Sequence, residues 1–215
     1  PPLSLSGVHP EFRILLGFER LRSAERRHHF KLGSTVDSIS AILASMSKFT
    51  SHQSVQTSLS IIESSDYLSL GTSSNGQPWV SPLYFAVTPE LDFVAISAVS
   101  SRHARNLRSN QSVSWCIFLG SEPPESTDGV YFEGIGEEVE PDQAQALADI
   151  LYDRRFPDPK ERADHPANPE YWESTGRRLY RFHPTNVSKV DLDDPAGVSR
   201  SAVPLDLLKS VHLAG

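Results

Sequence analysis

The chain has 215 residues, of which 38% are hydrophobic and 22% charged, and this composition excludes a short disulfide-stapled peptide and a wholly disordered chain. Its 20 Lys and Arg against 27 Asp and Glu give a formal net charge of -7, so we expect no nucleic-acid partner. Cys116 is the only cysteine, which excludes an internal disulfide and favours a reducing, cytoplasmic compartment. No apolar run approaches the roughly 18 residues of a membrane-spanning helix, so no membrane association is expected. Because the sequence begins Pro1-Pro2 without an initiator Met, we expect a trimmed chain or a fragment of a longer one.

Charge divides the sequence unevenly. Residues 1–58 hold seven of the 20 Lys and Arg but only four of the 27 Asp and Glu. Ser and Thr, which compete with helical hydrogen bonds, crowd residues 34–60. We therefore predict an N-terminal arm over 1–58 that is flexible or loosely packed, a folded domain over 59–190 and a C-terminal tail of loop over 191–215. The alternative for the arm is a basic helix over 12–30 that binds a partner or a membrane surface.

Beyond the arm the hydrophobic pattern becomes regular, and its alternation predicts strands joined by tight turns. Asn75-Gly76 lies between two strand-like runs and is a strong hairpin signal, because both residues tolerate positive φ. Pro82 cannot donate a ladder hydrogen bond, so the second of these strands should lie at a free edge or carry a bulge. Gly134 and Gly136 should mark a bulge or a close approach of two backbones. In chain order we predict a helix over 59–64, strands over 67–70, 79–87 and 91–98, a helix over 100–108, strands over 113–119 and 129–140, a helix over 141–152, an irregular connection over 156–172 and a strand over 178–190.

Short strands, tight turns and only two or three helices predict a mainly β (α+β) fold. They favour a small antiparallel barrel over the alternating strands and helices of a doubly wound sheet.

The start of the helix over 100–108 is the most informative stretch for function. A helix start exposes unpaired backbone N–H groups and a partial positive charge, and Ser100 or Ser101 can cap it. Arg102 and Asn106 fall one turn apart with His103 adjacent, so three polar heads could converge on one phosphate. The alternative is an amphipathic helix whose apolar residues face inward and whose basic side is solvated.

Several familiar sites can be excluded on spacing. The sequence has no Gly-rich phosphate loop ending in Gly-Lys-Ser/Thr, no Gly-x-Gly-x-x-Gly and no Gly-x-Ser-x-Gly. Its histidines are scattered, so we expect no metal site. Cys116 lies in an apolar alternating strand with no base near it in the sequence, and we interpret it as a small core residue rather than a nucleophile.

Six short motifs follow one another along the chain, namely Tyr67 to Thr72, Asn75 to Pro78, Trp79 to Phe85, Ser101 to Leu107, Tyr131 to Gly134 and Tyr152 to Pro157. In this order and spacing the chain resembles the pyridoxamine phosphate oxidase-like, FMN-binding split-barrel superfamily over about residues 59–184. Each motif is loose alone, and the resemblance rests on their combination. It implies an antiparallel six-stranded split β-barrel with flanking helices.

Members of that superfamily are homodimers with FMN at the subunit interface, and the resemblance implies the same arrangement here. Ser81 and Leu83 would line the cofactor from one strand, and Ser97 would lie at the end of the next. Trp172 matches a C-terminal aromatic residue that some members place near the flavin ring. The FMN phosphate or its neighbours would be held by Ser101, Arg102, His103 and Asn106.

The sequence departs from the vitamin-B6 oxidase of this superfamily at two positions. Those enzymes begin the flavin strand with a basic residue and close it with Lys, where this chain has Ser81 and Ala86. Pyridoxamine phosphate is therefore not the expected substrate. We predict an FMN-dependent oxidoreductase that transfers hydride to or from a small organic molecule, with no side chain assigned as a catalytic acid. The alternatives are a flavin-, deazaflavin- or haem-binding module without turnover and a plain β-barrel interaction domain.

Overall fold

The computed structural model describes residues 40, 50–119, 128–191 and 199–214, and every element discussed below lies within the unit Ser47–Gly215. The predicted basic helix over 12–30 lies outside the described residues. No described helix is both long enough and apolar enough to cross a membrane.

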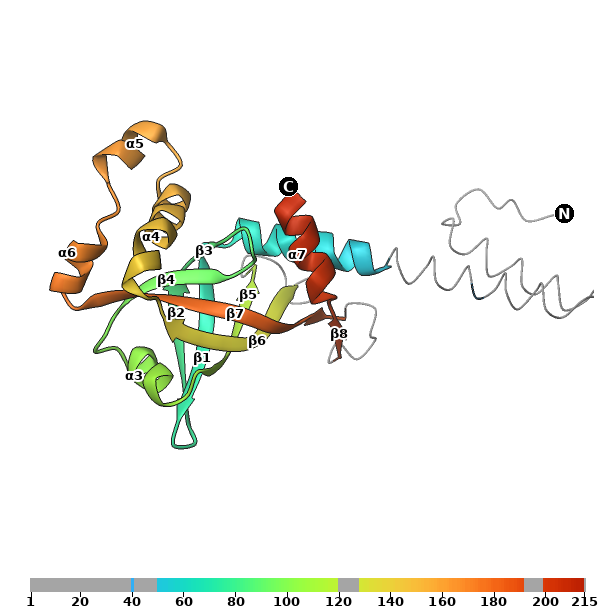
Figure 1. The fold of residues 1–215 in the computed structure, drawn as a ribbon. Helices are drawn as coiled ribbons and strands as arrows, with labels where there is room; N and C mark the ends of the chain where they lie inside the picture. Colours follow the sequence, from blue (N-terminus) through green and yellow to red (C-terminus); the bar gives the residue numbers. More distant parts are fainter. Residues whose placement is uncertain (1–39, 41–49, 120–127, 192–198, 215) are drawn as a thin grey trace, which may run out of the picture. The chain divides into compact units, whose positions relative to one another are not determined.

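The described part of the chain combines a set of strands with several helices (Figure 1). The described strands are β1 (Tyr67–Ser74), β2 (Gln77–Tyr84), β3 (Ala86–Val87), β4 (Phe93–Ala98), β5 (Ser112–Phe118), β6 (Gly129–Glu138), β7 (Arg177–Val190) and β8 (Arg200–Ala202). The described helices are a segment over residues 50–64, α3 (Arg102–Ser109), α4 (Pro141–Arg155), α5 (Pro159–Asp164), α6 (Pro169–Ser174) and α7 (Leu205–Ala214).

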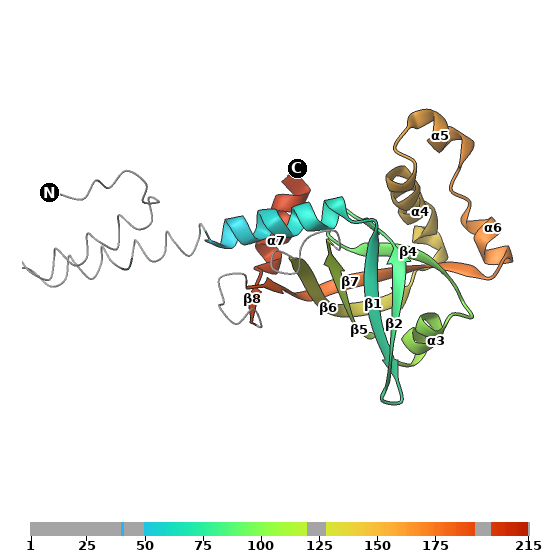
Figure 2. The ribbon, with the colours of Figure 1, turned by 180° about the vertical axis from the view of Figure 1, so that it is seen from behind.

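All the strand pairings are antiparallel. The sheet order is β2-β1-β5-β6-β7-β4-β3, with β8 added to β7. β2 and β3 stand at opposite ends of this order but are neighbours in the sequence, with only Phe85 between them. The chain therefore joins the two edges of the sheet and curls it into a barrel (Figures 1 and 2). The six longer strands confirm the predicted antiparallel split barrel with flanking helices.

The β1–β2 hairpin confirms the turn predicted at Asn75-Gly76. The two residues have φ of 51° and 73°, and Ser74 pairs with Gln77 across the two-residue turn. β2 lies at the edge of the sheet order, where Pro82 is tolerated because one side of the strand has no ladder to complete.

Gly134 marks the bulge predicted in β6. The pairing of β6 with β7 shifts register between Glu133 and Gly134, and a Cβ on Gly134 would collide with the carbonyl oxygen of His183. Only glycine allows the two backbones to come this close. Gly136 is also confined, since a Cβ there would lie 2.8 Å from the Leu107 side chain.

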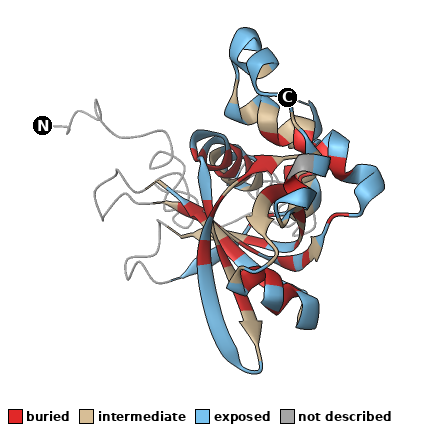
Figure 3. Ribbon diagram, turned by 90° about the vertical axis from the view of Figure 1, so that its left-hand side faces the viewer, coloured by how far each residue is buried: buried red, intermediate tan, exposed pale blue. Residues whose placement is uncertain are grey.

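The barrel interior is apolar, and buried residues alternate with more exposed ones along β1, β5 and most of β6 (Figure 3). Phe93 contacts three aromatic rings there, those of Phe85, Trp115 and Phe132, at centroid distances of 5.6, 5.3 and 4.9 Å. Such tilted and edge-on contacts are the favourable geometries for aromatic pairs. These ring contacts hold Phe93, Trp115 and Phe132 on the inner side of β4, β5 and β6.

A second hydrophobic cluster lies between the outer side of the sheet and the helices α4 and α6. Trp172 of α6 is 5% exposed, and its ring lies 5.2 Å from that of Tyr152 on α4. The other buried members are Ala86, Val94, Val139, Leu179, Ala144, Leu147, Ala148 and Leu151. These helices therefore cover one part of the barrel and leave the rest of its outer side to other elements.

The helix over residues 50–64 begins earlier than predicted and crosses the expected boundary at residue 58. Val55, Leu59 and Ile62 recur along one face of this helix and are buried. Their packing outweighs the weak helix propensity of the neighbouring serines and threonines. The helix therefore forms even though Ser and Thr side chains compete with helical hydrogen bonds.

Two segments expected to be irregular contain helices. α5 and α6 interrupt the connection over 156–172, and β8 and α7 occupy part of the C-terminal tail. Pro159 begins α5, where its missing N–H has no cost, and Asp158 caps the helix by accepting from two backbone N–H groups. Val203 and Leu208 are buried against the barrel. Burial of short apolar stretches against the barrel stabilises these elements of the tail, and no local sequence pattern predicts them.

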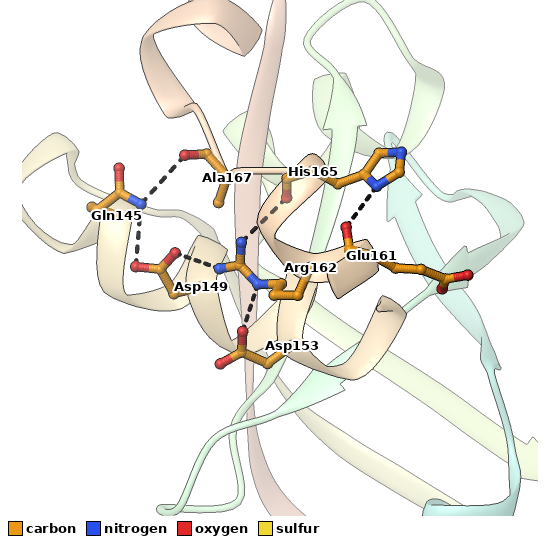
Figure 4. A network of polar contacts seen from close by, with 7 residues as sticks. All are labelled: Gln145, Asp149, Asp153, Glu161, Arg162, His165 and Ala167. Atoms are coloured by element: carbon orange, nitrogen blue, oxygen red, sulfur yellow. Dashed lines mark hydrogen bonds and ion pairs between the residues drawn. The ribbon is translucent and has the colours of Figure 1, made fainter. Parts of the chain in front are cut away.

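Polar contacts hold α5 against α4, since α5 buries no residue. Figure 4 shows Arg162 of α5 donating to Asp149 and Asp153 of α4, at 2.8 and 2.6 Å, and to the carbonyl oxygen of His165. The His165 ring stacks on that of Phe156, with centroids 4.3 Å apart. The position of α5 therefore depends on one guanidinium and one ring stack.

Arg154, near the end of α4, ties the helix over residues 50–64 to the barrel. Its guanidinium donates to the carbonyl oxygens of Ile62, Glu63 and Ser65 at 3.2, 3.3 and 2.6 Å, and it lies over the ring of Phe85. These carbonyls belong to the C-terminal end of the helix, where a cation also meets the helix dipole favourably.

Replacing Arg154 with Met should lower the free energy of unfolding by about 1.5 to 3 kcal/mol, because partly buried carbonyl groups lose a charged donor. Urea unfolding followed by circular dichroism measures the change. The matched control is Arg155→Met, since Arg155 is exposed and its described contacts are with the rings of Tyr84 and Phe156. Equal stability of the two variants would contradict the role assigned to Arg154.

Candidate functional site at the start of α3

The helix α3 follows directly from the end of β4 and is amphipathic. Ser101 is its N-cap, and the Ser101 Oγ accepts a hydrogen bond from the N–H of Ala104 at 3.3 Å. Ala104 and Leu107 are buried in the barrel. The opposite side is rich in arginine and exposes Arg102, Arg105 and Arg108.

His103 is turned inward, is 6% exposed, and has both ring nitrogens within hydrogen-bond distance of serine hydroxyls. Nδ1 lies 2.9 Å from the Oγ of Ser81 on β2. Nε2 lies 2.7 Å from the Oγ of Ser97 on β4 and 3.0 Å from that of Ser101. One imidazole therefore joins β2, β4 and the cap of α3.

The donors around this ring indicate the direction of its hydrogen bonds. Trp79 Nε1 donates to the Ser81 Oγ at 2.9 Å, which leaves the Ser81 hydroxyl proton for the Nδ1 of His103. We therefore assign the ring proton to Nε2, which donates to the serines on the other side. Burial lowers the pKa of His103, so the ring is neutral at pH 7.

Asn106, one turn further along, is also turned inward and is 6% exposed. Its Nδ2 donates to the Oγ1 of Thr72 on β1 at 3.0 Å. The side chains of His103 and Asn106 therefore do not point to the same place as the exposed Arg102, and the binding of one anion by all three stays a prediction. The reason is helix periodicity, which puts His103 and Asn106 on the buried face of α3 with Ala104.

Arg102 is the member of that predicted set that faces solvent. Its guanidinium carbon lies 4.6 Å from the centroid of the Trp79 ring. The N–H groups of Arg102 and His103 precede the first intrahelical hydrogen bond and have no partner in the described part of the chain. The first turn contains no acidic residue. The outer side of the helix start therefore offers a guanidinium, two N–H donors and the positive end of the helix dipole to an anion.

Leu83 and Trp172 lie apart from this cluster. Leu83 is 8% exposed and belongs to the barrel core, whereas Trp172 belongs to the cluster between the sheet and α4. The contacts assigned to all eight residues with a cofactor stay predictions. The structure brings together Ser81, Ser97, Ser101, Arg102 and His103, and it places Asn106 on the same helix.

The hydrogen bonds that Thr72 and Trp79 make were not predicted from the sequence. The two residues are cross-strand partners in the β1–β2 hairpin. Thr72 bonds Asn106 and Trp79 bonds Ser81, so both strands of the hairpin are tied to α3 or to its histidine network. The signal was the register of the two-residue turn, which places Trp79 opposite Thr72.

The outward face of β2, β1, β5 and β6 carries small and apolar side chains. A cavity of about 390 Å³ opens there, and its charged lining residues are Glu133 and Arg200.

Cys116 is half-buried in the lining of this cavity. The prediction that it is a core residue is therefore wrong, because Trp115 and Ile117 take the inward positions of β5. Burial raises the pKa of the Cys116 thiol, which disfavours the thiolate. Exposed apolar residues border the face, with Tyr67, Val80 and Phe118 at 62%, 63% and 51% exposure.

Comparison with known families identifies this architecture. Residues 56–191, more than half of the chain, match the pyridoxamine 5'-phosphate oxidase family, and the chain belongs to that family. The matched segment contains all eight of the predicted cofactor-binding residues. No curated protein sequence matches the chain.

Solved structures show the same fold at low sequence identity. A protein of unknown function from Agrobacterium tumefaciens is 20% identical with a TM-score of 0.52, over 64% of this chain and 56% of that one. A haem-binding protein from Mycobacterium smegmatis is 16% identical with a TM-score of 0.54, over 73% of this chain and 60% of that one. A proposed 5-nitroimidazole antibiotic resistance protein from Bacteroides thetaiotaomicron is 16% identical with a TM-score of 0.52, over 62% of this chain and 81% of that one. The chain thus spans less than two thirds of the first two.

Replacing His103 with Gln should weaken the pH dependence of stability below about pH 6.5. Because burial lowers the pKa of His103 in the folded protein, the unfolded chain binds the proton first as the pH falls. The wild type therefore loses stability below the unfolded value of about 6.5. Urea unfolding at about pH 7.5 and pH 5.5 measures this loss, which we expect to be smaller in the variant.

The matched control for this experiment is His165→Gln, which removes an exposed imidazole. It should show the same loss between the two pH values as the wild type. A loss in His103→Gln as large as that of the wild type would contradict a buried, neutral imidazole at this position.

Proposed function

We propose that this protein is an FMN-dependent oxidoreductase that transfers hydride to or from a small organic molecule. The observation that carries the proposal is the outward side of the α3 start, where Arg102 and two unpaired N–H groups can receive one phosphate. This site lies within the segment that matches the pyridoxamine 5'-phosphate oxidase family.

The residues present fit a phosphate better than a neutral ligand. Arg102 supplies a fork of N–H donors suited to phosphate oxygens, and no acid in the first turn opposes the charge. His103 adds no charge of its own, because its ring is neutral and bonded to serines. Its contribution is to hold Ser101 and the helix start in place, so His103, Ser81 and Ser97 act as positioning residues.

Bound FMN would supply the hydride chemistry at its ring, and the protein would supply binding and orientation. Trp79 is 40% exposed and lies against Arg102, so it borders the site. We assign no catalytic acid or base to a side chain.

We also propose that two copies of the chain associate through the outward face of β2, β1, β5 and β6. The support is the chemistry of that face, which combines small residues with exposed apolar ones and carries little charge. A second copy would cover Val80 and Phe118, and it would enclose a cofactor at the seam.

The alternative is a module that binds a flavin, a deazaflavin or haem without turnover. The fold shared with the haem-binding protein of Mycobacterium smegmatis supports haem as a candidate. Absorption titrations of the purified protein with FMN, a deazaflavin and haem separate these ligands. Anaerobic reduction of the bound flavin by a nicotinamide donor then separates an oxidoreductase from a carrier.

Replacing Arg102 with Gln should weaken FMN binding by about 1.5 to 3 kcal/mol, or roughly 10- to 150-fold in Kd, because a charge-assisted hydrogen bond is lost. Fluorescence titration of FMN into the protein measures the change. Lys160→Gln on α5 removes an exposed positive charge elsewhere and should leave the affinity unchanged. An FMN affinity equal to that of the wild type in Arg102→Gln would reject the phosphate site.

The proposed dimer predicts that Val80→Glu produces monomers, because a charge would be buried in an apolar contact. Light scattering after size-exclusion chromatography should give twice the chain mass for the wild type and one chain mass for the variant. Leu213→Glu is the control, since Leu213 is 70% exposed but lies on α7. A monomeric wild type, or a Val80→Glu variant that stays dimeric, would reject this interface.

A further inference from the structure

Arg102, Arg105 and Arg108 line the exposed side of α3, and we call this set the arginine ridge. The residues recur every three positions, so their Cα atoms span about 9 Å along the helix axis. Among the described residues, no carboxylate forms an ion pair with any of the three. In a chain of net charge -7 this positive ridge is local, which suits a small polyanion better than nucleic acid.

The main chain holds two of the three guanidinium groups in place. Arg105 Nη1 donates to the carbonyl oxygen of Ser100, and Arg108 Nη2 donates to that of Val99 at 3.2 Å. A guanidinium has five N–H donors, so most of them stay available for a ligand. Side chains that are already fixed lose less entropy on binding. This arrangement favours a binding role over a merely solvated basic surface.

The ridge carries more positive charge than one phosphate requires. A phosphate at the helix start uses Arg102 and the two N–H groups, whereas Arg105 and Arg108 bring two further guanidinium groups back to the carbonyls of Ser100 and Val99, just before the helix. They can therefore serve a second phosphate group. A protein partner fits less well, because Trp79 is the one exposed large apolar residue of the described part that contacts the ridge. Stable protein interfaces bury about 800 Å² on each partner around a few apolar or aromatic anchors.

We propose that the arginine ridge binds the adenosine 2'-phosphate of a phosphorylated nicotinamide dinucleotide, which would be the hydride donor of the flavin. This inference rests on the proposed function and names its electron donor. Arginine binds a phosphate through two parallel N–H bonds, and the ridge begins at the site proposed for the flavin phosphate. In the reaction the dihydronicotinamide loses a hydride and becomes a pyridinium, and the oxidised flavin takes up that hydride and one proton from solvent.

Isothermal titration calorimetry on the full chain tests the ridge directly, by comparing adenosine 2',5'-bisphosphate with adenosine 5'-monophosphate. We expect the bisphosphate to bind at least about tenfold more tightly, the scale of one added charge-assisted contact. Arg105→Gln/Arg108→Gln should remove most of this preference and leave the FMN affinity unchanged. The control Lys160→Gln, on α5, should keep the preference.

Equal affinities of the wild type for the two nucleotides would overturn the inference, even if the double variant did not fold. A preference that the folded double variant keeps would overturn it as well. A chain that prefers the bisphosphate but does not bind FMN would support the ridge and reject the flavin proposal. A chain that binds FMN and is reduced equally fast by the phosphorylated and unphosphorylated dinucleotides would reject the ridge alone.

Discussion

The hydrogen bonds of one buried imidazole determine the geometry of the candidate site. His103 bonds Ser81 of β2 through Nδ1, and it bonds Ser97 of β4 and the cap residue Ser101 through Nε2. Burial keeps the ring neutral, and a neutral ring can donate from one nitrogen and accept at the other. Without these bonds the two strands and the helix start would no longer share a hydrogen-bond partner. Each buried polar group would then need a different partner to avoid the cost of an unmade hydrogen bond. The direction of Arg102 and of the free N–H groups follows from this arrangement.

The inward position of His103 changes the electrostatics that the helix start can offer. A helix start with two exposed cations would bind an anion through charge alone, whereas this one offers a single guanidinium, two N–H groups and the helix dipole. The remaining positive charge on this face comes from Arg105 and Arg108, whose guanidinium groups reach back to the carbonyls of Ser100 and Val99. The site therefore carries more positive charge than one phosphate needs, which suits a ligand with more than one phosphate group. Membership of the pyridoxamine 5'-phosphate oxidase family gives the fold and its class.

The sequence predicted the barrel well because its signals are local. Asn75-Gly76 set the hairpin through turn chemistry, and alternation in β5 set its inward and outward faces. The cap of α3 was predictable from its residue type, and the exposure of its arginines from helix periodicity. Periodicity also puts His103 on the face of Ala104, but its hydrogen bonds were not predictable, because its partner Ser81 is 22 residues away and is brought near only by barrel closure. The helix over residues 50–64 and the tail elements were missed for a similar reason, since burial of Val55 and Leu208 against the barrel stabilises them.

Nuclear magnetic resonance of the labelled protein during an FMN titration tests the central claim most directly. It observes the backbone amides of Arg102 and His103 and the imidazole nitrogens of His103 in the same sample. We expect both amide signals to shift on saturation, while the ring nitrogens keep the shifts of a neutral imidazole bonded on both sides. Unmoved amides with FMN bound elsewhere, or a ring that is protonated when the ligand binds, would contradict a phosphate site held in place by a neutral histidine.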